Sequence, residues 1–172
     1  SFGNPTTTTR STCAGATAPA TTSAGTRASS NNYGTDGRFV LSSTNAANQS
    51  ETKTYDNRYG RILSLTGPNG LTTSWQYDNF GRKTKETRSD ATYTIWTYKL
   101  CTDAGANCPG PIAGAVSTWV AIEQSYAVNA TVNAPEQRTY FDAFNRVLRT
   151  QTQGFDGSGA APTLVQDTEY NA

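Results

Sequence analysis

One short phrase occurs twice in this chain and constrains the fold more than any other feature of the sequence. It reads Tyr55-Asp56-Asn57-Arg58-Tyr59-Gly60-Arg61, and 22 residues later it returns, one residue shorter, as Tyr77-Asp78-Asn79-Phe80-Gly81-Arg82. A short period of this kind indicates one small supersecondary unit that is stacked several times. The chain is therefore expected to be a repeat protein.

Each residue of the phrase suits a tight corner between two antiparallel strands. The tyrosine ends one strand, the Asp and Asn side chains hydrogen-bond the turn backbone, Gly60 or Gly81 supplies a positive φ, and the arginine begins the next strand. The aspartates are interpreted as turn caps, because a catalytic pair of carboxylates would occur once and not in every repeat. The arginines are expected to bond neighbouring turns.

Weaker copies of the phrase begin at Tyr33 and Tyr140. In the second of these, Asn145 stands where the stronger copies have glycine, and asparagine also tolerates a positive φ. The predicted structural repeat residues are Tyr55, Asp56, Gly60, Arg61, Tyr77, Asp78, Gly81, Arg82, Tyr140, Asp142, Asn145 and Arg146.

At these residues the chain resembles the YD-repeat, or RHS-repeat, family, densely over residues 33–99 and again over residues 136–172. The resemblance implies an all-β fold of stacked antiparallel β-hairpins that forms part of a spiral shell, tube or fibre wall. Bacterial RHS toxins, insecticidal toxin complexes and teneurins contain such walls. No match to the self-cleaving core of RHS toxins is found, so the resemblance implies neither proteolysis nor toxin activity here.

Alternating side chains and turn residues predict where the strands lie. Residues 118–128 are compatible with a strand or a short helix, because their periodicity does not decide between the two. The other predicted strands are 6–12, 39–43, 50–55, 61–66, 71–77, 82–88, 92–100, 137–141, 146–153 and 163–170.

The chain is expected to be a single β-repeat module over residues 1–172, with a low-complexity loop at 13–32 and a Cys/Pro/Gly-rich insertion at 101–117. Joined tail to head, Tyr170-Asn171-Ala172 and Ser1-Phe2-Gly3-Asn4 form a segment as long as Tyr55–Arg61, with the tyrosine, the aromatic residue and the glycine in register. This leads to the hypothesis that the sequence is one period of a longer tandem array. The alternative is a long repeat protein cut at arbitrary points.

The three cysteines bear on the compartment. Cys101 and Cys108 are close enough in sequence to form a disulfide, with two free thiols as the alternative, and Cys13 is left free or pairs with another copy. A disulfide favours an extracellular or cell-surface location. No export leader is visible, so any such signal is expected outside these residues.

Composition excludes several function classes. The chain has no histidine, which removes the usual Ser-His-Asp and Cys-His triads and the HExxH zinc site. Its net charge of +1 predicts no nucleic-acid partner, and no apolar stretch approaches the ~20 residues that span a membrane. No catalytic residue, cofactor or metal site is predicted.

The sequence therefore predicts a non-enzymatic structural module that assembles with further copies of itself into an extracellular fibre, tube or sheath. Two alternatives remain. The chain could be a segment of a toxin-encapsulating RHS shell, or an adhesin module that binds surface glycans or a receptor through Trp75, Trp96 or Trp119.

Overall fold

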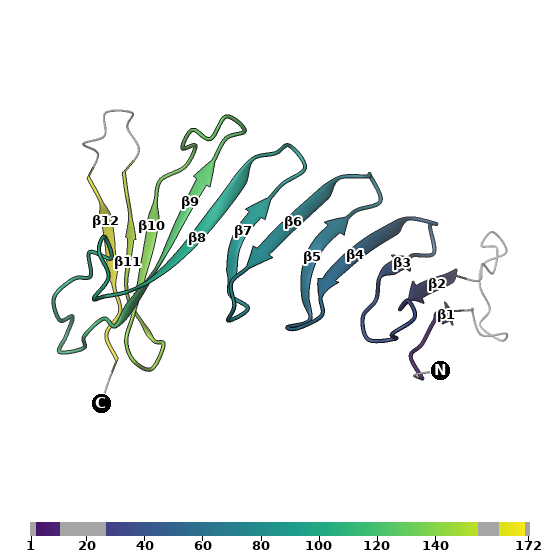
Figure 1. The fold of residues 1–172 in the computed structure, drawn as a ribbon, viewed down its shortest axis with the longest axis horizontal. Helices are drawn as coiled ribbons and strands as arrows, with labels where there is room; N and C mark the ends of the chain where they lie inside the picture. Colours follow the sequence, from purple (N-terminus) through teal and green to yellow (C-terminus); the bar gives the residue numbers. More distant parts are fainter. Residues whose placement is uncertain (1–2, 11–26, 155–161, 171–172) are drawn as a thin grey trace, which may run out of the picture. The chain divides into compact units, whose positions relative to one another are not determined.

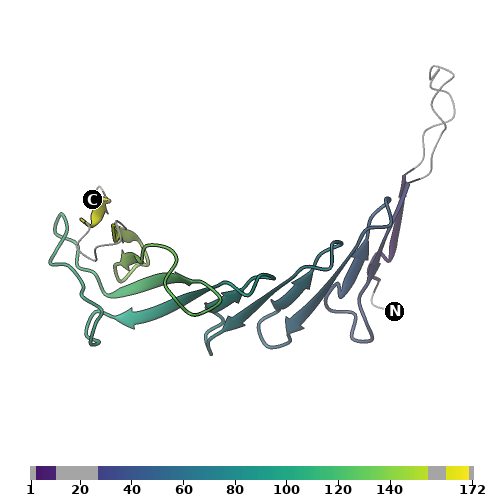
Figure 2. The ribbon, with the colours of Figure 1, turned by 90° about the horizontal axis from the view of Figure 1, so that it is seen from above.

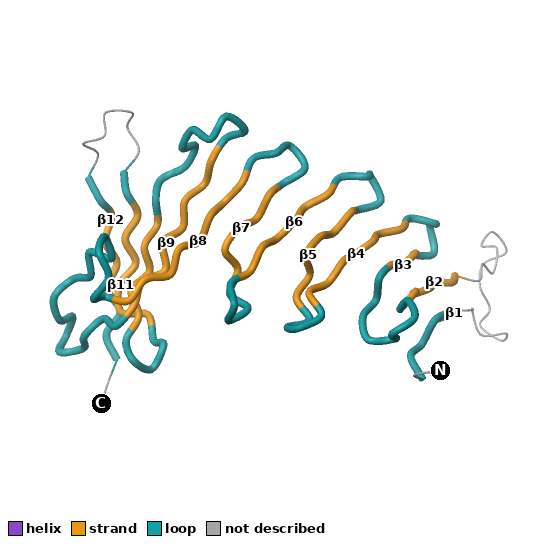
Figure 3. Tube along the Cα trace, in the orientation of Figure 1, coloured by secondary structure: helices purple, strands orange, loops and turns teal. Residues whose placement is uncertain are grey.

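The computed structural model describes residues 3–10, 27–154 and 162–170. Within these ranges the chain consists of strands joined by turns and loops, with no helix (Figures 1 and 3). The strands are β1 (Thr7–Arg10), β2 (Arg27–Asn32), β3 (Ser42–Thr44), β4 (Ser50–Asp56), β5 (Arg61–Thr66), β6 (Thr72–Tyr77), β7 (Lys83–Thr87), β8 (Tyr93–Leu100), β9 (Trp119–Tyr126), β10 (Gln137–Phe141), β11 (Val147–Thr152) and β12 (Leu164–Asp167).

The strands are hydrogen-bonded in the order in which they occur in the chain, from β1 to β12, and their pairing is antiparallel. Figure 2, turned by 90° from Figure 1, shows the same succession of strands. Tight turns between consecutive strands explain this succession. At the β5–β6 hairpin, for example, Gly70 has φ 74° and the Asn69 side chain accepts the N–H of Leu71. The prediction of an all-β fold of stacked antiparallel hairpins is confirmed.

Most strand positions agree with the alternation of side chains in the sequence. The bounds of β5 and β10 are those predicted, and β9 lies within residues 118–128, which were compatible with a strand or a helix. The predicted loop at 13–32 is wrong in part, because Arg27–Asn32 forms β2 between β1 and β3. Short Ser and Asn side chains do not prevent a strand whose backbone is paired on both sides. Residues 11–26 lie outside the described residues.

The contacts separate the chain into two compact units, Ser1–Ser74 and Trp75–Ala172, where the sequence predicts a single module. In the first unit none of the described residues is fully buried. Its strands are tied by the backbone ladder and by cross-strand hydroxyl pairs such as Thr54 and Ser64, whose oxygens lie 2.6 Å apart. The first unit is therefore a thin sheet without a thick apolar core.

The second unit has a small core on one face of β9 and β10. Val120 and Tyr140 are fully buried and Ile122 nearly so, and all three pack with Ala106 from the connection between β8 and β9. Leu148 on β11 is also buried. The core thus depends on a segment outside the strands.

That segment is the Cys loop, residues 101–108, which lies within the predicted insertion at 101–117. Cys101 and Cys108 form a disulfide with a Cα–Cα distance of 5.5 Å. The guanidinium of Arg138 on β10 donates to the carbonyl oxygens of Gly105 and Ala106 at 3.2 and 3.1 Å. The insertion therefore interrupts the repeat but also covers the core of the second unit.

Candidate functional site

The repeat corners are the features that the sequence singles out, and residues 78–82, the Asp78 corner, show their chemistry most fully. The Oδ1 atom of Asp78 accepts the backbone N–H groups of Phe80 and Arg82, each at 2.9 Å. Gly81 has φ 75°, and its N–H donates to the carbonyl oxygen of Asp78. The Arg82 guanidinium closes the corner, since its Nε lies 2.7 Å from Oδ2 of Asp78.

Residues 142–146, the Asp142 corner, repeat this arrangement in the second unit. Oδ1 of Asp142 accepts the N–H groups of Phe144 and Arg146 at 2.9 Å, and Nε of Arg146 lies 2.8 Å from Oδ2. Asn145 takes the glycine position with φ 62°. Asn145 therefore has the positive φ that was predicted for the residue at the glycine position.

The choice of Tyr140 as the motif tyrosine is wrong, because Phe141 occupies the place directly before the aspartate. A bulge between Tyr140 and Phe141 shifts the register of β10 at this point. Phe141 stacks on Trp119 with ring centroids 4.0 Å apart, whereas the Tyr140 ring is buried in the core. Phe141 therefore packs at the corner, whereas Tyr140 packs in the core.

Residues 56–61, the Asp56 corner in the first unit, are one residue longer, and the extra residue changes the partner of the aspartate. Arg58 places its backbone N–H 2.8 Å and its terminal guanidinium nitrogen 2.9 Å from the Asp56 carboxylate. Gly60 keeps a positive φ of 64°, and Arg61 begins β5. The arginine that closes this corner is thus Arg58, whereas Arg61 is the first residue of β5.

The corner arginines also contact a tyrosine further along the chain, and this contact was not predicted from the sequence. The Arg82 guanidinium lies 4.3 Å from the ring centroid of Tyr98, whose hydroxyl donates to the carbonyl oxygen of Lys83 at 2.9 Å. Burial raises the pKa of the Tyr98 hydroxyl, which keeps it protonated as a donor. We call this combination of cation–π contact and hydrogen bond the tyrosine tie.

The tyrosine tie recurs at the Asp142 corner, where Arg146 lies 4.7 Å from the ring centroid of Tyr170 and the Tyr170 hydroxyl donates to Val147. In the first unit the Tyr55 hydroxyl makes the same kind of hydrogen bond, to the carbonyl oxygen of Val40, but the Tyr55 ring stacks on Phe39 in place of an arginine. The prediction that the arginines bond neighbouring turns is therefore wrong for Arg82 and Arg146. Each bonds the aspartate of its own turn and contacts the ring of a tyrosine further along the chain. The signal in the sequence is a tyrosine 15 residues after the accepting carbonyl, as in two of the three cases.

The corner aspartates are held in their charged form. Burial by itself raises the pKa of Asp78, but the backbone N–H and guanidinium of Arg82 and the N–H of Phe80 outweigh burial and lower that pKa below its ordinary value. The pKa of Asp142 is lowered in the same way, against the opposing effect of burial, by Arg146 and the N–H of Phe144. Both carboxylates thus act as acceptors and not as proton donors.

Acid is expected to weaken the second unit through these two aspartates. A carboxyl whose pKa is lower in the folded chain gives stability that is fully present above its unfolded pKa, about 3.9 for Asp, and is lost as the pH falls through the folded value. We expect the urea midpoint to stay level between about pH 7 and pH 5 and to decrease below about pH 4. Trp75, Trp96 and Trp119 all lie in the second unit, so tryptophan fluorescence reports its unfolding.

A matched variant isolates this contribution. Asp78→Asn combined with Asp142→Asn keeps an oxygen that accepts the backbone N–H groups but removes the charge that titrates. The decrease in midpoint on acidification should be smaller in this variant. Equal decreases in both proteins would contradict the assignment.

The described residues offer little chemistry beyond packing at the corners. Within residues 3–10, 27–154 and 162–170 no group of three or more Asp, Glu or Cys side chains could hold a metal ion. In the same ranges no helix is long and apolar enough to cross a membrane. The Asp78 and Asp142 corners each bond an arginine to the aspartate of the same turn and to a tyrosine later in the chain.

The tryptophans proposed for ligand binding are engaged within the sheet. The indole N–H groups of Trp75 and Trp96 donate to Glu86 and Glu123, each at 2.9 Å, and that of Trp119 donates to Asn145 at 3.0 Å. The Trp96 ring also has Lys83 at 3.9 Å from its centroid. These contacts join each tryptophan to a polar or charged side chain of a neighbouring strand or turn.

The comparisons with known proteins agree with the geometry of the corners. Residues 55–93 match the family model described as RHS Repeat, and this segment contains the Asp56 and Asp78 corners. The match confirms the resemblance to the RHS-repeat family that the repeated phrase indicates. No curated protein matches the chain. The chain therefore carries the RHS repeat, and residues 55–93 are the part that identifies it.

Proposed function

We propose that the chain is a non-enzymatic structural module that extends a β-wall, and that its partners are further copies of itself arranged head to tail in an extracellular fibre, tube or sheath. The observation that supports this most is the tyrosine tie. Each tie joins a corner to a tyrosine further along the chain, so a hairpin gains stability from the segment that follows it. Such nearest-neighbour coupling is the physical basis of repeat arrays.

Two features at opposite ends of the sequence support the head-to-tail arrangement. Tyr170 contacts Arg146 and Val147 as Tyr98 contacts Arg82 and Lys83, so it stands where a further corner would begin. Gly3 has φ 69°, close to the 75° of Gly81. We propose that a corner of this kind joins one copy to the next.

The exposed strands β1 and β12 are suited to this extension. All four residues of each strand are exposed, and within the described residues β1 pairs with β2 and β12 pairs with β11, which leaves the second edge of each available. An open edge presents unpaired backbone groups to another strand. In the proposed array, β1 of one copy would pair with β12 of the preceding copy. The Cys101–Cys108 disulfide supports an extracellular location for such an array.

The test compares a single copy with two copies fused directly, Ala172 to Ser1. If the join forms a corner, the fused chain should unfold at a higher urea concentration than the single copy, because the second copy adds an interface. A third protein with a flexible Gly/Ser linker of about ten residues at the join serves as the control, since such a linker decouples the copies. It should lose the gain.

Equal midpoints for the single copy and the direct fusion would contradict the head-to-tail proposal. Negative-stain microscopy of longer fusions then distinguishes the two kinds of wall. Long uniform filaments would support the fibre, whereas isolated hollow particles would contradict it and favour a segment of an encapsulating shell.

A further inference from the structure

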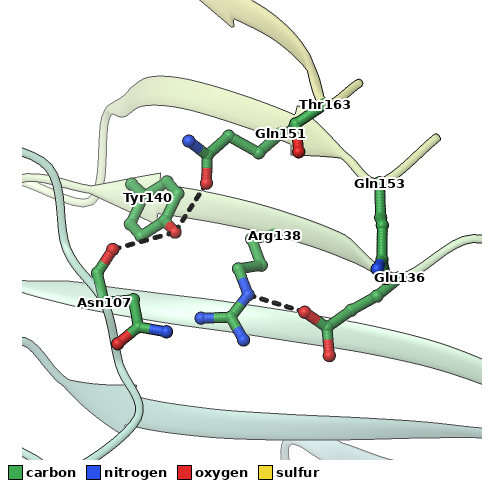
Figure 4. A pocket seen from close by; sticks show the side chains of 7 residues that line it. All are labelled: Asn107, Glu136, Arg138, Tyr140, Gln151, Gln153 and Thr163. Carbon is green, nitrogen blue, oxygen red and sulfur yellow. Dashed lines mark hydrogen bonds and ion pairs between the residues drawn. The ribbon is translucent and has the colours of Figure 1, made fainter. Parts of the chain in front are cut away.

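A polar pocket lies beside the Cys loop, away from the corners. Its volume is about 260 Å³, and seven side chains line it. They come from the Cys loop, from β10 and β11, and from residues next to β10, β11 and β12, as Figure 4 shows: Asn107, Glu136, Arg138, Tyr140, Gln151, Gln153 and Thr163. Every one of them carries a hydrogen-bonding group, and none is aliphatic.

Two of the lining side chains are fixed in place. The Tyr140 side chain is buried, and its hydroxyl lies 2.8 Å from Oε1 of Gln151 and 3.2 Å from the carbonyl oxygen of Asn107 (Figure 4). Nε of Arg138 lies 2.7 Å from Oε1 of Glu136. Although burial opposes the charge of Arg138, its bond to Glu136 raises the pKa of the guanidinium. The pocket is therefore preformed, and its two charges neutralise each other.

Other lining groups have no protein partner among the described residues. They are Oε2 of Glu136, the amide nitrogen of Gln151, and the side chains of Gln153 and Thr163. This set contains an acceptor, amide groups that donate and accept, and a hydroxyl that does both. A ligand with several closely spaced hydroxyl groups satisfies such a mixture, whereas an apolar ligand would leave it unpaired.

The geometry points to a binding site for one uncharged hexose unit, free or at the end of a glycan. The balanced charges of Arg138 and Glu136 do not select an anion or a cation. The volume lies just below the range of about 300–1,000 Å³ found for drug-sized ligands, which suits one sugar ring and not an oligosaccharide. This site is independent of the proposed assembly, because none of its residues belongs to a corner.

Saturation-transfer NMR with a panel of neutral hexoses and N-acetylhexosamines tests the proposal on the intact chain. At least one sugar should receive saturation, with a dissociation constant on the order of a millimolar, as expected for so small a ligand. Thr163→Trp should weaken that binding at least about tenfold by filling the pocket. Thr163 is exposed, so the substitution leaves the buried network in place.

Val128→Trp is the matched control, because Val128 is exposed in the β9–β10 connection and does not line the pocket. It should bind as the unaltered chain does. Tryptophan fluorescence in urea verifies that both variants fold. Absence of transfer to every sugar tested would overturn the proposal. Binding that Thr163→Trp leaves unchanged would also overturn it, whether seen with free sugars or on a glycan array, since the sugar would then bind elsewhere.

Discussion

Removal of the disulfide is expected to lower the free energy of unfolding of the second unit by about 2–3 kcal/mol. The estimate is the loop-closure entropy of a short loop, since Cys101 and Cys108 are seven positions apart. A further loss follows if the Cys loop leaves the core, because Ala106 is fully buried there. The variant is Cys101→Ser with Cys108→Ser, measured by urea denaturation with tryptophan fluorescence.

The measured stability should not depend on the third cysteine of the chain. All proteins carry Cys13→Ser, which removes the third thiol and prevents exchange. Thr102→Ala, an exposed position in the same loop, is the matched control and should change stability little. If the double serine variant unfolds at the same urea concentration as this control, the Cys loop does not stabilise the core.

Truncation of Tyr140 is expected to have a still larger effect, a loss of about 3–5 kcal/mol for Tyr140→Ala, as for other buried aromatic side chains. The ring is fully buried against Val120 and Ala106. Tyr140→Phe should cost less, about 1–3 kcal/mol, because the ring remains but the hydroxyl partners at Asn107 and Gln151 lose their donor. The measurement is again urea denaturation followed by tryptophan fluorescence.

Tyr126→Phe provides the comparison for the hydroxyl. Tyr126 stacks on Tyr93 in the same unit, and within the described residues its hydroxyl makes no hydrogen bond. This variant should be nearly as stable as the unaltered chain. The proposed role of the Tyr140 hydroxyl would be refuted if Tyr140→Phe and Tyr126→Phe had the same small effect.

Local chemistry explains why so many of the strands could be predicted. The bounds of β5 follow from a corner before it and a Pro-Asn-Gly turn after it, both of which act over a few residues. The aspartates were predicted as turn caps for the same reason, and Asp78 and Asp142 accept the turn N–H groups as expected. Turn interactions between residues that are close in sequence can therefore be predicted from a single sequence.

The features that were missed depend on contacts between distant residues. The tie of Tyr170 to Val147 spans 23 positions, which no turn motif covers. The pocket joins Asn107 to Thr163 through the tertiary fold. In each case the partner, and not the residue itself, decides the role.

The position of Tyr98 has a consequence for how such chains can be altered. Its tie to Lys83 is made on β8, before the insertion begins, and it persists although the short corner that would follow is replaced by a long disulfide-bonded segment. The ladder is thus secured upstream of the connection, so a repeat can exchange its short corner for a longer segment as long as the tyrosine is kept. The Cys loop shows what such a segment can add, because it places Ala106 in the core of the second unit.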